Sequence, residues 1–133
     1  MLEVWSDRLL PPLAEYDEQL PLEAYLENTL FAFGSQIGRT DCRQVAICVL
    51  AEAHRDPQLY QRMADAVYLP RINSIMQAFK HAQEKGEFSQ DIDIDVAIDE
   101  LFGAVWYKVL IRFGTVDKAY IKKLVRQVFR SNS

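Results

Sequence analysis

Three aspartates alternate with isoleucines in the run DIDID, at Asp91, Asp93 and Asp95. Calcium loops of the EF-hand kind place carboxylates at loop positions one, three and five in this way. Such a loop also needs a glycine at position six and a bidentate glutamate at position twelve. Those positions here hold Val96 and Phe102. The run therefore predicts no calcium site, and we expect Asp93 or Asp95 to cap a helix that begins there.

The histidines and the short motifs offer no catalytic constellation. Neither His54 nor His81 has a glutamate three residues before it, so the Glu-x-x-His pairs of di-iron bundles do not occur. The sequence has no glycine-rich phosphate loop and no Gly-x-Ser-x-Gly elbow. We therefore expect that the protein is not an enzyme and carries no metal or other cofactor.

The net charge and the cysteines indicate which partners and which cellular compartment suit the chain. The formal net charge is −4, and an acidic body repels DNA phosphates, so the chain as a whole is a poor nucleic-acid binder. The basic stripe from Lys118 to Arg130 is the one feature that would favour nucleic-acid binding, and we expect it to be a solvated face. Cys42 and Cys48 lie on different sides of any helix and cannot pair. Two free thiols and no signal-peptide pattern indicate a reducing cytoplasm.

The spacing of apolar residues is helical along almost the whole chain, which predicts an all-α fold in a single domain of 133 residues. Pro21 suits a helix start, Asp41 and Asp56 suit N-caps, and Gly86 suits a C-cap. Pro70 should kink or break the helix that contains it. The six expected helices span about 1–10, 21–38, 41–55, 57–86, 95–113 and 117–130.

The fifth expected helix is apolar on every side. It has no charge from Leu101 to Tyr107, a run far shorter than the roughly 20 residues that span a bilayer. A membrane segment is therefore excluded for this helix. A helix that is apolar all round must be covered all round, and Gly103 and Ala104 would let another helix approach closely. This favours a helix that packs on its own chain with one side and on another chain with the other.

The last expected helix also has a wide apolar half, opposite its lysines and arginines. Two neighbouring helices with surplus apolar surface predict a homodimer in which they form an intermolecular four-helix bundle across a two-fold axis. The alternative is that both helices are simply central to the core of one chain. The expected interface residues are Leu101, Phe102, Gly103, Ala104, Val105, Trp106, Val109, Tyr120, Leu124, Val125 and Val128.

Several segments together resemble one family. They are the helix start DPQL, the PR dipeptide midway along the long helix, AQEKGEF at the turn, LFGAVWYKVL, and the closing VDKAYIKKLVRQVF. In this order they resemble the C-terminal regulatory domain of TetR-type transcriptional regulators, over roughly residues 20–130. The resemblance implies an all-helical dimerisation and ligand-binding domain of a repressor that senses a small molecule.

The resemblance also implies a domain plan. Residues 1–19 would be the remnant of a connecting helix with a linker, and residues 20–133 the regulatory domain. On this plan we expect the N-terminal helix-turn-helix domain, which such regulators use to bind operator DNA, to be absent from this chain. We therefore expect no operator binding by this chain alone. A free-standing dimeric helical adaptor, without ligand or DNA, is the alternative function.

An effector pocket in such a domain would lie among the second, fourth and fifth expected helices. Aromatic and methionine side chains at helical spacing are more often plain core than ligand contacts. No cluster of charge indicates a ligand class. The candidates for lining the pocket are Tyr25, Phe33, His54, Tyr60, Met63, Tyr68, Met76 and Trp106.

Overall fold

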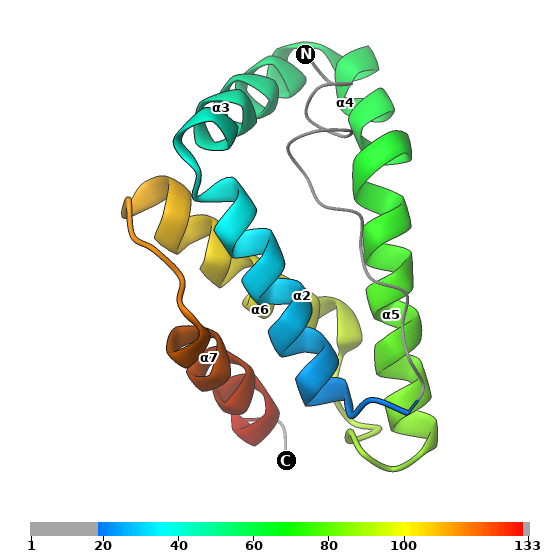
Figure 1. The fold of residues 1–133 in the computed structure, drawn as a ribbon. Helices are drawn as coiled ribbons and strands as arrows, with labels where there is room; N and C mark the ends of the chain where they lie inside the picture. The colour runs from blue at the N-terminus through cyan, green and yellow to red at the C-terminus, as the bar shows by residue number, and fades with distance from the viewer. Residues whose placement is uncertain (1–18, 132–133) are drawn as a thin grey trace.

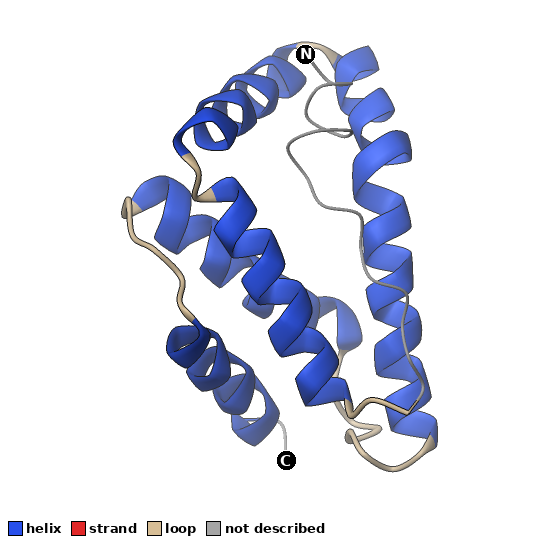
Figure 2. Ribbon diagram, viewed as in Figure 1, coloured by secondary structure: helices blue, strands red, loops and turns tan. Residues whose placement is uncertain are grey.

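The computed structural model describes residues 19–131. Figure 2 shows that this part of the chain is built from helices and loops, with no strand in it, which confirms the all-α prediction. The expected helix at 1–10 lies outside the described residues. The helices are α2 (Leu22–Ile37), α3 (Thr40–Arg55), α4 (Pro57–Met63), α5 (Leu69–Glu84), α6 (Ile94–Trp106) and α7 (Lys118–Ser131), and π-helical turns η2 (Ala64–Tyr68) and η3 (Tyr107–Ile111) follow α4 and α6.

Helix α2 lies at the centre of the arrangement (Figure 1). It packs against α5, α6 and α7, while α3 and α4 form a corner at one end of the molecule. Each of these helices turns one apolar stripe toward α2 or its neighbours, which is how amphipathic helices build a shared core. None of the helices in residues 19–131 is long and apolar enough to cross a membrane.

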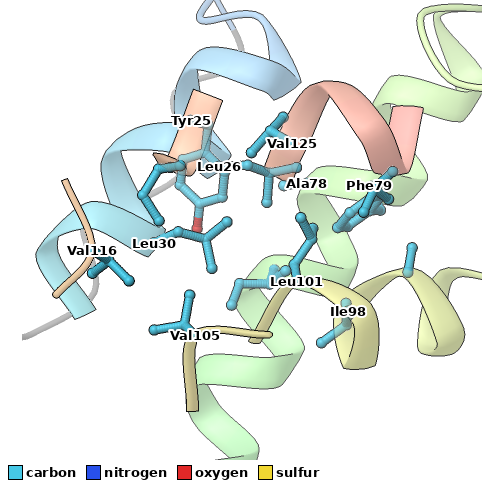
Figure 3. Close-up of a cluster of buried hydrophobic side chains, with 14 of the residues drawn as sticks. Tyr25, Leu26, Leu30, Ala78, Phe79, Ile98, Leu101, Val105, Val116 and Val125 are labelled. Carbon is cyan, nitrogen blue, oxygen red and sulfur yellow. The ribbon is translucent and has the colours of Figure 1, made fainter. Parts of the chain in front are cut away.

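The core is a single cluster of large aliphatic and aromatic side chains. Figure 3 shows Leu26 and Leu30 of α2 facing Phe79 of α5, Leu101 of α6 and Val125 of α7. All five are fully buried. Burying each such side chain stabilises the fold by roughly 1.5–3 kcal/mol relative to its exposed state, so this cluster fixes the relative positions of the four helices.

Aspartate caps set two of the helix starts as expected. The Asp56 carboxylate accepts hydrogen bonds from the backbone N–H groups of Gln58 and Leu59, with Pro57 at the first helical position. Asp93 accepts one from the backbone N–H of Val96, at 3.2 Å, and so caps α6. Gly86, with φ +80°, takes the left-handed position just after α5.

The expected cap at Asp41 is wrong. Helix α3 begins at Thr40, two residues before the start that a cap at Asp41 would give, and Arg39 occupies the N-cap position without a side-chain cap. Asp41 therefore lies in the first turn, where its carboxylate pairs with the Arg39 guanidinium at 3.1 Å. The extended backbone of Arg39 (φ −67°, ψ 142°) starts the helix too early for Asp41 to cap it.

Pro70 interrupts the long helix expected at 57–86. The ring of a proline clashes with the carbonyl four residues before it, and the proline lacks an N–H. The π-helical turn η2 accommodates the proline. The turn ends with a hydrogen bond that the Leu69 N–H donates to the Ala64 carbonyl, five residues earlier. The expected break thus takes the form of a wide π-helical turn between α4 and α5.

Helix α6 also ends in a wide turn. The helix expected at 95–113 starts at Ile94, continues as η3 after Trp106, and ends with Phe113 in the left-handed region at φ 54°. The Gly114 N–H closes the end by donating to the Lys108 carbonyl at 2.8 Å. A bulky residue rarely adopts a positive φ, so the backbone here is strained at an exposed aromatic residue.

Candidate ligand pocket and interaction face

A small pocket lies in the corner between α3, α4 and η2. Its volume is about 220 Å³, which is below the range of roughly 300–1,000 Å³ usual for drug-sized ligands. On α3 its lining residues recur at spacings of three and four, the signature of one helix face. The lining residues are Leu50, Ala53 and His54 of α3, Tyr60 and Met63 of α4, and Ala64 of η2.

The pocket has an apolar floor and a polar rim. Met63 and Ala53 are buried, whereas His54 is exposed and the Tyr60 side chain is 56% exposed. An imidazole and a phenol can each donate or accept one hydrogen bond at the rim. The arrangement suits a small, mainly apolar molecule with one hydrogen-bonding group.

Three of the eight residues predicted to bind ligand meet in this pocket: His54, Tyr60 and Met63. Tyr25 instead lies in the core, where burial raises the pKa of its phenol and a hydrogen bond with Thr29 lowers it less. Met76 packs half-buried against the same core. The structure does not describe the side chain of Tyr68.

The remaining two candidates, Phe33 and Trp106, contact each other outside the pocket. Their ring centroids are 5.3 Å apart at an interplanar angle of 71°, and the ring centroid of Phe102 lies 5.4 Å from that of Phe33. These edge-on and tilted geometries are favourable for aromatic pairs. The three half-buried rings therefore join α2 to α6.

Sequence reasoning missed three pocket residues: Leu50, Ala53 and Ala64. Leu50 and Ala53 share the helix face of His54, and this spacing was the available signal. Nothing in the sequence marked Ala64, because its place at the pocket depends on the π-helical turn.

Helix α6 and η3 present an exposed strip that carries three large apolar side chains beside the acids Asp99 and Glu100, and we term this strip the outer face. It contains Val96, Tyr107 and Ile111, with side chains 52%, 56% and 64% exposed. Gly103 lies between them, and a Cβ built there would meet nothing within 4 Å. Because a wide π-helical turn rotates less per residue, η3 keeps Ile111 in line with Tyr107. Sequence reasoning had named only Gly103 of this strip.

The residues predicted for the dimer interface fall into two groups within one chain. The half-buried residues and the exposed Gly103 retain surface for a partner, while the buried ones are already covered by their own chain. Buried are Leu101, Val105, Val109, Val125 and Val128; half-buried are Phe102, Ala104, Trp106, Tyr120 and Leu124.

The acidic run before α6 has structural roles. Asp93 caps α6 and Asp95 lies in its first turn. Within residues 19–131, no three histidine, cysteine, aspartate or glutamate side chains converge as metal ligands. Neither Cys42 nor Cys48 forms a disulfide; Cys42 is buried and Cys48 is exposed.

Comparisons with known proteins agree on one kind of domain. The family model described as "Tetracyclin repressor-like, C-terminal domain" matches residues 21–128. The crystal structure of the TetR family transcription regulator SCO0332 superposes with a TM-score of 0.75 at 25% identity, over 97% of this chain and 68% of that one. The uncharacterized HTH-type transcriptional regulator YdeS of Bacillus subtilis (strain 168) is 28% identical over 75 residues, or 56% of this chain. The matched segment spans only 38% of that regulator's length.

Proposed function

The chain belongs to the tetracyclin repressor-like family of transcription regulators, as their C-terminal domain, and on that premise we propose that residues 20–133 are the regulatory half of a repressor. In this proposal the domain forms a homodimer and senses a small molecule. Operator DNA would be bound through a helix-turn-helix domain outside these residues.

The observation that carries the dimer is the outer face. Four positions along α6 and η3 expose apolar surface or bare backbone, and three of their side chains are more than half exposed. Exposed apolar strips of this kind mark interaction sites on soluble proteins. The test is analytical ultracentrifugation of the chain at micromolar concentration, and a stable species of 15.4 kDa would contradict the dimer.

The observation that supports sensing is the pocket between α3 and α4. Its floor is apolar and its rim carries His54 and Tyr60, so the proposed effector is a small apolar molecule with one hydrogen-bonding group. Indole is a suitable probe because it is flat, apolar and has a single N–H.

Methionine methyl resonances provide the readout for indole. Met63 lines the pocket and Met76 does not, so a protein with ¹³C-methyl methionine contains both a reporter and an internal reference. We expect a saturable shift of Met63 alone, weakened by His54→Ala or Tyr60→Ala. Gln44→Ala changes an exposed α3 residue away from the pocket and should leave binding unchanged.

The second candidate function is a dimeric helical adaptor without ligand, which the outer face favours on its own. A dimer by ultracentrifugation with no saturable Met63 shift, for indole or for a panel of similar molecules, would support the adaptor over the sensor.

A further inference from the structure

The turn that ends η3 holds a bulky residue in a strained conformation. Phe113 has φ 54°, and its side chain is 73% exposed. Left-handed backbone is unfavourable for a residue with a Cβ, and such strain persists only where the surrounding structure holds it. Gly114, which could adopt this conformation without strain, directly follows Phe113 in the sequence. Some contact therefore holds the strain at Phe113.

Arg43 of α3 makes such a contact. Its guanidinium carbon lies 6.0 Å from the centre of the Phe113 ring, at the outer limit of a cation–π interaction. Its Nη2 donates to the Gly38 carbonyl at 3.2 Å, where α2 meets α3. One side chain thus joins α3 to the loop between η3 and α7. Because the contact lies at this limit, a small shift of α3 would break it.

Lys108 connects the same turn to α7. The Gly114 N–H donates to the Lys108 carbonyl at 2.8 Å, and a Cβ built on Gly114 would lie 3.1 Å from the Lys108 Cγ. The Lys108 ammonium in turn lies 3.7 Å from the centre of the Tyr120 ring of α7. A change in the backbone at Phe113 would therefore disturb the contact between Lys108 and α7.

The C-terminal half of α3 lines the pocket, with Leu50, Ala53 and His54. Leu50 lies seven residues after Arg43, about two helical turns along the same face. A molecule that fills the pocket and pushes α3 away from α4 would therefore shift Arg43 as well. The position of Arg43 over Phe113 thus depends on the separation of the two helices at the pocket.

We infer that Arg43 and Phe113 form a latch between the pocket and α7. When α3 is displaced, the guanidinium leaves the ring and Phe113 relaxes to a negative φ. The hydrogen bond from Gly114 to Lys108 then opens, and Lys108 loses its place beside Tyr120. The latch rests on contacts within the chain, and only the idea that a small molecule displaces α3 rests on the proposed sensing function.

Amide hydrogen exchange at Gly114 reports the state of the latch, because the bond to the Lys108 carbonyl protects this N–H. Ala53→Leu fills the pocket from α3 without any ligand and should raise the exchange rate at Gly114 by about tenfold. Ala64→Leu fills the pocket from η2 and should do the same. Gln44→Leu adds the same side chain at an exposed position of α3 away from the pocket and should leave the rate unchanged.

Substitutions in the latch itself complete the test. Arg43→Met removes the guanidinium and Phe113→Leu removes the ring, while each keeps an apolar side chain. Each should raise the Gly114 exchange rate by about tenfold, and the two together no further, because both break one contact. Ala53→Leu should have no added effect when combined with Arg43→Met. Arg39→Met, which removes an exposed guanidinium paired with Asp41, is the matched control and should leave the rate unchanged.

Two results would overturn the latch. One is an unchanged exchange rate at Gly114 in both pocket-filling variants while circular dichroism shows them folded. The other is an additive effect of Arg43→Met and Phe113→Leu in the double variant. Failure of indole to shift Met63 would contradict the sensing function alone, because the substitutions test the latch without a ligand.

Discussion

Gly34 and Val116 lie so close that a Cβ on Gly34 would overlap the Cγ2 of Val116. Gly34 belongs to α2, and Val116 to the loop that leads into α7. The side chain of Val116 is buried, and the Cγ1 of Val105 would lie 3.3 Å from the same Cβ. This contact brings the loop onto α2 and sets where α7 begins to pack.

Gly34→Ala should therefore destabilise the fold although alanine is the better helix former. Overpacking a well-filled site costs about 1–3 kcal/mol, and we expect a loss of this size in the free energy of unfolding measured with urea. Val116→Ala in the same chain removes the overlapping methyl groups and should recover part of the loss. Additive destabilisation in the double variant would show that the two residues do not interact as described.

The substitutions Val105→Glu and Ile111→Glu should have different effects: the first should unfold the protein, and the second should only dissociate the dimer. The side chain of Val105 is 0% exposed within its own chain and that of Ile111 is 64% exposed. A carboxylate at Val105 should unfold the protein, because an unpaired buried charge costs several kcal/mol. Ile111→Glu should leave the helical circular dichroism and the melting temperature of the monomer unchanged while it dissociates the dimer. Lys122→Glu, on the exposed side of α7, should do neither.

Asp93→Ala should destabilise the protein by about 1 kcal/mol, the usual effect of losing an N-cap. The Asp93 carboxylate accepts from the Val96 N–H at 3.2 Å, and alanine leaves that donor without a cap. Chemical unfolding measures the loss. Asp91→Ala removes a neighbouring acid that caps no helix, so an equal effect of both substitutions would assign the loss to charge instead.

The two thiols should react at different rates. Burial, with the nearby Asp41 carboxylate, raises the pKa of the Cys42 thiol, so the folded protein holds this proton to higher pH than the unfolded chain does. The stabilisation from Cys42 is therefore complete below the ordinary thiol pKa and is lost as the pH rises through and above it. At pH 8, iodoacetamide should modify the exposed Cys48 first, as followed by mass spectrometry. Equal rates in the folded protein would contradict the burial of Cys42.

This chain alone should not bind duplex DNA specifically. Its net charge is −4, and non-specific affinity comes from neutralised phosphates. The one feature that would favour DNA binding is a set of exposed cations on α7. They are Lys118, Lys122, Lys123, Arg126 and Arg130. A gel shift at physiological salt checks the prediction, and sub-micromolar, sequence-dependent binding would refute it.

The helices could be predicted from sequence because their signals are local. Asp56, Asp93 and Gly86 occupy the cap positions that their side chains favour. The prediction of a cap at Asp41 was wrong because the extended Arg39 backbone, which no residue type dictates, starts α3 two residues earlier than such a cap would. Helix boundaries therefore depend on small differences in backbone conformation between neighbouring residues.

The sites were harder to predict because they depend on packing between helices. The all-round apolar character of α6 indicated two covered sides, but it could not show that Val105 faces the core and Tyr107 faces outward. That division depends on the angle at which α6 crosses α2. The pocket depends likewise on the corner between α3 and α4, so only His54, Tyr60 and Met63 of the predicted ligand residues meet there.

The π-helical turn η2 has a consequence for how related chains should be aligned. A wide turn holds one residue more than an α-helical turn, so it absorbs a one-residue insertion without rotating the helices on either side. Met63 and Ile75, twelve positions apart, are both buried, although twelve steps of an unbroken α-helix would turn them about 120° apart. With one residue absorbed, the difference falls to about 20°. An alignment gap of one residue therefore belongs within 64–68, and a relative that lacks this residue should have a straight helix and no proline at the position of Pro70.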